Sequence, residues 1–305
     1  MLQSFYTIKP YNINMNKLKI AEMISTFTNP PIICIPLFLI ICLILSFENG
    51  VFDMSEFIVL ELISLVFASI LPMAIILYWV KKLDTDSDIS NRQDRFTPLI
   101  VGIVSYFIGF LISLYLSADN FLTALLLCYC VNTGIVLLIT LKWKISVHTT
   151  GLSGPVGALI LLLGPIGALF AVLYPILIWS RVTLNKHTMA QAVAGGVQGF
   201  FLTILEMYLY IFLFNFNVCP LTPLVDCIWY ILAIIFTPIV LCVLSYFDIL
   251  HKKRLFAIAE ILGLIFFLAF SPFNVFLIYV IISIASILIS LYAGKDYSWF
   301  NVIKS

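Results

Sequence analysis

Two histidine-containing stretches of this chain carry the residue types needed for chemistry on an anionic group. The first is Ser146-Val147-His148, and the second runs from Ser180-Arg181 to Lys186-His187. An imidazole can act as a nucleophile or transfer a proton, and a guanidinium offers a fork of N–H donors that matches phosphate oxygens. His187 directly precedes an apolar run, so the free N–H groups at the start of that helix would face the same anion. The pattern predicts a phosphate-binding site, provided that the fold brings the two stretches together.

The composition identifies the class of protein that must position these residues. Hydrophobic residues make up 63% of the chain and charged residues only 10%; the mean hydropathy is +1.14. A soluble domain has about 25% charged residues, so these values indicate an integral membrane protein surrounded by membrane lipids. Long uninterrupted apolar runs favour membrane-spanning helices over the alternating pattern of a barrel. The net charge of +1 gives no indication of a nucleic-acid partner.

Apolar runs divide the chain into membrane segments bounded by charged residues, Pro or Gly. They cover residues 31–47, 57–80, 97–117, 121–141, 152–179, 188–216, 227–247, 255–271 and 273–292. The run 152–179 is about 28 residues long and has Gly164-Pro165 at its centre. It predicts either one long kinked span or a hairpin of two helices of about 13 residues each, because Pro breaks a helix interior but is tolerated at a helix start.

The positions of the positive charges favour the hairpin. With a hairpin at 152–179 and a cytoplasmic N-terminus, all 16 lysines and arginines fall on one face of the membrane. The positive-inside rule assigns that face to the cytoplasm. We therefore expect an all-α, polytopic transmembrane helical bundle in the cell membrane, with about ten membrane segments and both termini cytoplasmic. The two helices of the hairpin, being short, would be re-entrant or shielded by their neighbours.

This topology places three polar loops on the same face. The loops are 81–96, 142–151 and 180–188, and they contain Arg95, His148 and His187 respectively. We divide the chain into a cytoplasmic N-terminal segment, 1–30, a catalytic core, 31–217, and additional C-terminal transmembrane helices, 218–305. The candidate site belongs to the core.

These residues resemble the three motifs of the type 2 phosphatidic acid phosphatase superfamily. Arg95 stands for the first motif, Ser146-Val147-His148 for the second, and Ser180-Arg181 with His187 for the third, in the family's order and with its Ser-Arg-x5-His spacing. The match covers roughly residues 60–215. The glycines at 195, 196 and 199 also resemble the helix that follows the family's third motif, and we expect them to allow close helix packing.

The resemblance implies a role for each matching residue. His187 would be the nucleophile that forms a phosphohistidine, and His148 would protonate the leaving group. Arg95 and Arg181 would hold the phosphoryl oxygens, and Ser146 would donate a hydrogen bond to the same group. The substrate would be a lipid phosphate or diphosphate. No metal or other cofactor is implied, because the arginines neutralise the charge of the phosphoryl group.

The chain departs from the family's pattern at two functional positions. Asp88 stands where the first motif has a lysine, so Lys81, Lys82 or Arg92 would have to supply the missing cation to the phosphate. Gln191 stands where the third motif has an aspartate. Residues four apart share a helix face, so the side-chain oxygen of Gln191 can still hold His187. An amide does not stabilise a cationic imidazole as a carboxylate does, and we expect activity to survive at a lower rate.

Two other functions agree with parts of the sequence but not with the whole pattern. The pattern Asp84-x3-Asp88-x3-Arg92 is similar to the diphosphate–Mg²⁺ motif of UbiA-type prenyltransferases. Those enzymes need a second carboxylate cluster about a hundred residues later, and the loop 180–188 has none. A non-catalytic carrier would typically show repeated halves and polar sites at the membrane midplane. We find no internal repeat, and the polar groups cluster at the membrane boundary.

Overall fold

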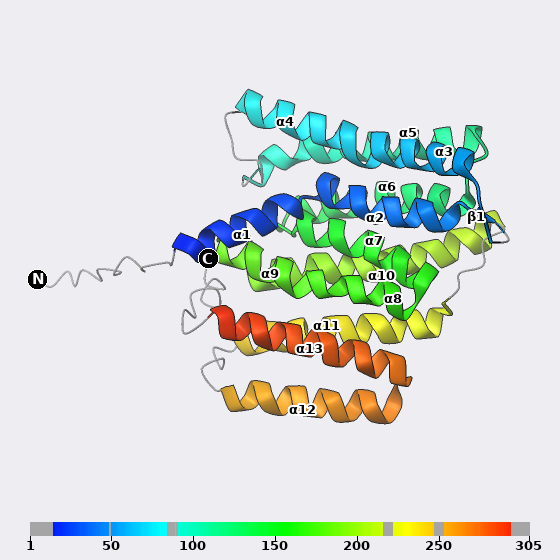
Figure 1. The fold of residues 1–305 in the computed structure, drawn as a ribbon. Coiled ribbons are helices and arrows are strands. Elements are labelled where there is room, and N and C mark those ends of the chain that lie inside the picture. Colours follow the sequence, from blue (N-terminus) through cyan, green and yellow to red (C-terminus); the bar gives the residue numbers. More distant parts are fainter. Residues whose placement is uncertain are drawn as a thin grey trace, which may run out of the picture.

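The computed structural model describes residues 15–48, 50–83, 89, 91–215, 222–246 and 253–293. Its helices lie side by side in one elongated bundle (Figure 1). In chain order they are α1 (Met15–Phe27), α2 (Pro30–Leu45), α3 (Met54–Ser64), α4 (Leu71–Leu83), α5 (Phe96–Tyr115), α6 (Asn120–Thr140), α7 (Val147–Leu163), α8 (Pro165–Leu169), α9 (Leu173–Thr183), α10 (Met189–Phe214), α11 (Leu224–Tyr246), α12 (Lys253–Phe270) and α13 (Phe273–Ala293). A short antiparallel hairpin joins α2 to α3. Its two strands, β1 (Phe47–Glu48) and β2 (Val51–Phe52), have two residues each.

The described helices confirm an all-α, polytopic membrane bundle. Six are long and apolar enough to cross a bilayer, and one of these joins α3 and α4 through a π-helical turn, Leu65–Ile70. A further candidate is the pair α1 and α2, which is bent by 58° between Phe27 and Pro30. Three shorter apolar helices, Val147–Leu163, Leu255–Phe270 and Phe273–Ile289, complete the set. The total agrees with the expected ten or so membrane segments.

The chain reverses direction at Gly164, as the hairpin prediction requires. Gly164 has φ +55°, a backbone conformation that suits a residue without Cβ, and Pro165 then begins α8. In α8, Gly167 lies against α7 so closely that a Cβ there would be 2.1 Å from the carbonyl oxygen of Leu159. The start of α7 and the end of α9 consequently lie at the same end of the bundle (Figure 1).

The two helices of the hairpin are longer than we predicted. α7 has 17 residues, and α8 and α9 together form a candidate span of 19 residues, Pro165–Thr183. The estimate of about 13 was wrong because both helices continue past the apolar run into the polar motifs. Ser146 caps α7 before the apolar residues begin, and α9 ends two residues after Arg181. The motif residues therefore stand largely on helix ends, not on loops.

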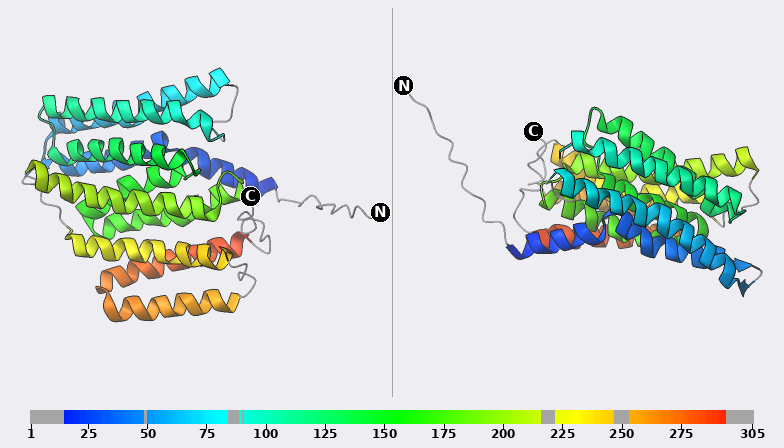
Figure 2. Two further views of the ribbon diagram at one scale, coloured as in Figure 1. Left: turned by 180° about the vertical axis from the view of Figure 1, so that it is seen from behind. Right: turned by 90° about the horizontal axis from the view of Figure 1, so that it is seen from above.

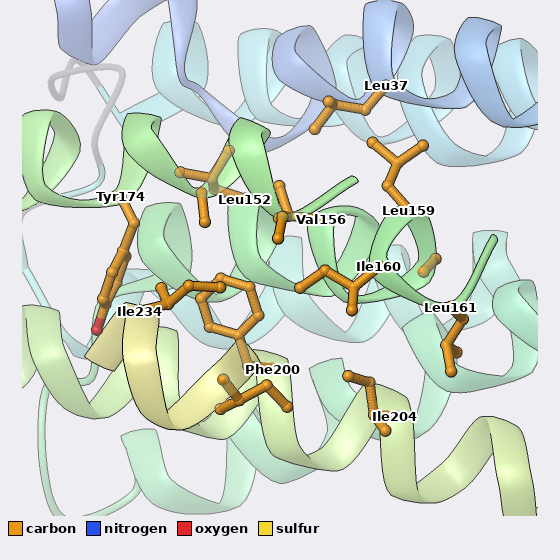
Figure 3. Packing of buried hydrophobic residues seen from close by; sticks show 14 of the residues in the cluster. Leu37, Leu152, Val156, Leu159, Ile160, Leu161, Tyr174, Phe200, Ile204 and Ile234 are labelled. Carbon is orange, nitrogen blue, oxygen red and sulfur yellow. The ribbon is translucent and has the colours of Figure 1, made fainter. Parts of the chain in front are cut away.

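α7 lies at the centre of the bundle, shielded by α2, α8 and α10. Its apolar side chains Val156 and Ile160 meet Phe200 and Ile204 of α10 (Figure 3). The glycines of α10 allow this approach: a Cβ on Gly195 would be 2.5 Å from the carbonyl oxygen of Ser146. Small residues at such contacts let helix backbones come close in a membrane, where packing is a main source of association energy. The predicted packing role of the α10 glycines is confirmed, and it joins the second motif to the helix that follows the third.

The helix ends that carry the motifs gather at one end of the bundle. The end of α4, the start of α5, the start of α7 and the end of α9 lie there, next to α1 (Figures 1 and 2). The β1–β2 hairpin and the turn at Gly164 lie at the opposite end. Alternating helix directions thus bring the helix ends that flank the three polar segments to one end of the bundle, as the predicted arrangement requires. The assignment of that face to the cytoplasm stays a prediction.

Candidate functional site

His187 lies in the short connection between α9 and α10. Thr188 begins α10 with a capping box, in which the Thr188 hydroxyl accepts from the backbone N–H of Gln191 at 3.2 Å and the Gln191 side-chain oxygen accepts from the N–H of Thr188 at 3.1 Å. This reciprocal pair fixes the first turn of the helix and the position of Gln191. The His187 side chain is only 3% exposed. A buried imidazole at a rigid helix start is suited to a defined orientation.

The hydrogen bonds of His187 determine which ring nitrogen carries the proton. Nδ1 lies 3.2 Å from the backbone oxygen of Lys144 and 3.3 Å from Oε1 of Gln191. Because the Thr188 N–H donates to the same Gln191 atom, that atom is the oxygen of the amide, and both neighbours of Nδ1 are acceptors. Nδ1 must therefore donate, which leaves the lone pair on Nε2. The predicted contact between Gln191 and His187 is confirmed.

Nε2 of His187 is buried and has no hydrogen-bond partner among the described residues. Burial lowers the pKa of His187 well below its ordinary value of 6.5, and the positive charges of Arg95, Arg181 and Lys144 lower it further. The hydrogen bond with Gln191 acts in the opposite direction but does not outweigh these effects. At neutral pH the imidazole is therefore neutral, with its Nε2 lone pair available.

His148 stands in the first turn of α7 and is 6% exposed. The charges of Arg181 and Arg95, and the imidazole of His187, act on it electrostatically, and the backbone of Ser25 hydrogen-bonds it. Residues that lie up to 92 positions apart, from Arg95 to His187, are thus collected into one buried cluster. The four residues of this histidine–arginine cluster are Arg95, His148, Arg181 and His187.

Arg95 connects two of the loops that surround the cluster. It ends a 3₁₀ turn, Gln93–Arg95, just before α5 and is 5% exposed. Its Nε donates to the backbone oxygen of Ile89 at 2.8 Å, and its Nη1 donates to that of Ile145 at 3.3 Å. The Ile145 carbonyl directly precedes Ser146, so the guanidinium of the first motif holds the second motif in place. The turn itself is tied to α4, since Trp79 Nε1 donates to the oxygen of Asp94 at 3.1 Å.

Arg181 is fully buried in the last turn of α9, where the helix dipole favours a positive charge. Its Nη1 donates to the hydroxyl of Ser25 in α1. The neighbouring Ser180 also contacts α1, because its hydroxyl donates to the backbone oxygen of Ala21 at 2.6 Å. Helix α1 therefore covers the cluster and orients both Arg181 and His148. Sequence reasoning missed this role, because it separated residues 1–30 from the predicted catalytic core.

The remaining predicted phosphate ligands occupy different positions. Ser146 is fully buried, and its hydroxyl caps α7 by accepting from the N–H of Thr149 at 3.4 Å. Lys82 is exposed at the end of α4, with its amine 5.0 Å from the ring centre of Trp79, and Arg92 is half-buried. The largest electrostatic effects on the two imidazoles do not come from Lys82 or Arg92, whereas Lys144 is among the charges that act most strongly on His187. Lys144 is the cation that the sequence interpretation did not select.

The aspartate motif that resembles UbiA-type prenyltransferases, Asp84-x3-Asp88-x3-Arg92, falls mainly on residues that the structure does not describe. Asp84 and Asp88 lie outside the described residues, as does Asp86 between them. Among the described residues, no group of three or more His, Cys, Asp or Glu side chains is arranged to hold a metal ion.

A cavity of about 100 Å³ opens beside the cluster. Arg95 and His148 line its polar end, and Ile76 of α4 with Leu99 and Gly102 of α5 line its apolar walls. The start of α2, Asn29–Pro31, closes another side. Space therefore continues from Arg95 and His148 along α5 between the helices, whereas Arg181 and His187 do not line it.

Comparisons of the chain with protein-family models, with curated proteins and with solved structures give no match.

Proposed function

We propose that the protein is a membrane-embedded, metal-independent phosphatase that hydrolyses a lipid phosphate or diphosphate through a phosphohistidine on His187. The observation that carries the proposal is the state of the His187 ring. Nδ1 is engaged by two oxygens, which leaves Nε2 as an unprotonated and unpartnered nitrogen among the described residues. A nucleophile is activated in this way when its lone pair is available at neutral pH and its orientation is fixed.

The neighbouring residues support each step of the reaction. Nε2 of His187 attacks phosphorus, the bond from phosphorus to the leaving oxygen breaks, and His148 donates a proton to that oxygen. The negative charge of the bound phosphate favours the protonated form of His148 before this step. Water then attacks the phosphorus of the phosphohistidine while His148 accepts a proton from it, the bond from phosphorus to Nε2 breaks, and phosphate leaves with His187 regenerated. Arg95, Arg181 and Lys144 supply positive charge where negative charge develops, in a buried site where such interactions are strong.

The cavity beside the cluster supports a lipid as the substrate. A substrate whose phosphate contacts Arg95 and His148 would extend along the apolar walls formed by α4 and α5. Such a tail would stay within the hydrophobic interior while its headgroup reacts at the end of the bundle. By the positive-inside rule, we propose that this end faces the cytoplasm, together with both termini.

His187→Ala is the direct test of the proposed function. The variant should release no phosphate above background from a panel of glycerolipid and polyisoprenyl phosphates, because the nucleophile is absent. The matched control is His251→Ala, since His251 is the third histidine of the chain and lies outside the three motifs. The purified wild-type protein should also remain active in EDTA. Full turnover by His187→Ala would contradict the mechanism, and a requirement for Mg²⁺ would favour the prenyltransferase instead.

A further inference from the structure

A buried carboxylate lies among the C-terminal helices, apart from the histidine–arginine cluster. Glu260 of α12 is 4% exposed, and three hydroxyl groups from the two neighbouring helices donate to its Oε2. Thr237 of α11 donates at 3.1 Å and Tyr279 of α13 at 3.0 Å, and Ser283 of α13 is the third donor. Glu260, Thr237 and Ser283 each stand near the middle of a helix. The carboxylate is therefore deep in the bundle, between three apolar helices.

The second oxygen of this carboxylate is left over. Oε1 of Glu260 is buried and forms no hydrogen bond with any described residue. The described partners of Oε2 are hydroxyl groups, and no lysine or arginine is among them. A buried charge is costly unless an opposite charge or a proton neutralises it. An ionisable group of this kind inside a membrane bundle typically belongs to an ion or proton site.

A row of hydroxyl groups on α13 continues from Glu260 to a small cavity. Ser283 and Ser286 are three residues apart and share one face of α13. The Ser286 hydroxyl is buried and has no hydrogen-bond partner in the described part of the chain. Ser286 lines a cavity of about 20 Å³ together with Pro238 of α11, which leaves the backbone oxygen of Ile234 without its helical donor. A water molecule needs about 10–15 Å³ and polar partners, so one water fits beside Ser286.

The cavity lies toward the end of the bundle that carries the histidine–arginine cluster. Its other walls include Ile178 and Trp179 near the end of α9 and Met189 at the start of α10. The ring of Trp179 packs against that of Tyr292 in α13, with 5.7 Å between the ring centres. The last turns of α9 and α13 accordingly lie at the same end of the bundle (Figure 1). The hydroxyl row therefore runs from the middle of the bundle toward this end.

The chemistry of the row favours a proton over a metal cation. A hydroxyl group donates one hydrogen bond and accepts others, so serine hydroxyls and water in a row can pass protons along it. A hard metal cation needs six or more oxygen ligands, and carboxylates are its usual ligands. Among the described residues, no group of three or more His, Cys, Asp or Glu side chains is arranged to hold a metal ion.

We propose that Glu260 is a proton-binding site, loaded through Ser286 and Ser283 from the end of the bundle that carries the histidine–arginine cluster. Ser283 passes its own proton to Oε2 of Glu260 and takes another from the water beside Ser286. The carboxylate becomes a neutral acid, and neither serine keeps a charge. The reverse transfers release the proton at the same end. The site is independent of the proposed phosphatase function.

Few other titratable groups surround this site. Tyr279 is the described titratable side chain of the two neighbouring helices that contacts Glu260. The others stand nearer the helix ends, and they are Asp226, Cys227, Tyr230 and Cys242 of α11 and Tyr292 of α13. A change in the protonation of this region would therefore report on Glu260 itself.

Infrared difference spectroscopy of the purified protein tests the binding of the proton. Spectra are recorded from about pH 4 to about pH 9, a range that includes the titration of buried carboxyl groups. A carboxylic acid C=O band that is absent from Glu260→Gln belongs to Glu260. This band should be present at low pH and lost as the pH rises. A wild type without such a band at any pH, or with one that persists unchanged throughout, would overturn the proposal.

Two kinds of variant secure the assignment of the band. Glu206→Gln is the matched control, because Glu206 is a buried carboxyl group of α10 and its loss should leave the Glu260 band in place. Tyr279→Phe and Ser283→Ala each remove one donor to Oε2 and should shift the frequency of the band. These two variants identify the band even if Glu260→Gln does not fold. A band that none of the three substitutions around Oε2 alters would contradict the assignment to Glu260.

Transfer of the protein into D₂O tests the path of the proton. Deuteration shifts the Glu260 band, so the rate of the shift measures how fast protons reach the carboxyl group. Ser286→Ala should slow this exchange about tenfold, the effect of losing about one hydrogen bond from the path. Ser113→Ala should not, because Ser113 is an equally buried serine in α5, away from α13 (Figure 1). Equal rates in the wild type and Ser286→Ala would refute the path. A rise in unfolding temperature with Na⁺ that Glu260→Gln abolishes would show that the ligand is a cation, and the proton site would be refuted.

Discussion

Replacing Gln191 by Glu should move the acid limb of the pH–activity profile to higher pH. Glutamate has the same length as glutamine and is favoured at this position of a capping box, so the bond from the Thr188 N–H is kept. The change places a negative charge 3.3 Å from Nδ1 of His187, where an amide oxygen now lies. A nearby negative charge stabilises the protonated imidazole and raises the pKa of His187. Protonated His187 has no lone pair on Nε2, so the variant loses activity at a higher pH.

The size of this shift follows from the contact distance. Two unit charges 3.3 Å apart interact by about 5 kcal/mol at an effective dielectric constant of about 20, which corresponds to almost 4 pKa units. Gln191 is only half-buried, so solvent screens part of this interaction. We therefore expect a rise of about 1 to 3 units, the range that opposite charges in contact produce. Because the pKa of His187 starts well below 6.5, the limb should move toward that value.

The assay is kcat/KM for phosphate release as a function of pH, from pH 4 to pH 8 in roughly half-unit steps, which reports the ionisation of the free enzyme. Gln191→Met is the control, because it removes the acceptor oxygen without adding charge. This control should lower kcat through loss of ring orientation and should leave the acid limb at or below its original position. An acid limb that stays in place in a folded Gln191→Glu variant, or moves to lower pH, would refute the assignment of His187 as the neutral nucleophile.

Two further predictions concern helix α1 and the topology. Ser25→Ala removes the hydroxyl that accepts from Arg181, and hydrogen bonds to charged groups contribute about 1.5–3 kcal/mol, so kcat/KM should fall at least tenfold while Ser25→Thr retains activity. Unchanged kinetics of Ser25→Ala would show that α1 does not orient the guanidinium. A cysteine at the exposed position Asn185 should react with a membrane-impermeant maleimide only from the cytoplasmic side, and one at Tyr115, at the opposite end of the bundle, only from outside. Labelling of the parent protein, which has only the native cysteines, measures the background. Labelling of position 185 from outside and of position 115 from the cytoplasmic side would contradict the proposed orientation.

Much of the fold could be predicted because it depends on local properties of the chain. Apolar runs identify membrane helices by length and composition, and Gly164-Pro165 marks a reversal because one residue tolerates positive φ and the other starts a helix. Helix ends were predicted less well, since α7 and α9 extend into polar residues that hydropathy assigns to loops. Their polar side chains are satisfied by neighbouring helices, and hydropathy along the chain contains no information about such neighbours.

Part of the histidine–arginine cluster could also be predicted. Motif spacing identified Arg95, His148, Arg181 and His187, and the structure collects these four into one buried cluster. The i, i+4 relation of His187 and Gln191 on a helix start predicted their contact, which is local in sequence. Lys144 was not selected, because its contribution comes from its backbone oxygen and its charge at a position 43 residues before His187. No residue pattern indicates a backbone acceptor.

The sequence by itself determined that this protein is a bundle of membrane helices with a reversal at Gly164, and which residue types are available for chemistry. Hydropathy, turn formation and spacing along a helix depend on neighbouring residues, so they can be read from the chain. Only the tertiary structure decided that Ser25 binds Arg181, which lies 156 residues later, and that Nδ1 of His187 is held while Nε2 is left available. It alone also placed Arg95 and His148, which are 53 residues apart, on one cavity. Such relations depend on how distant helices pack, and packing is a property of all their side chains together.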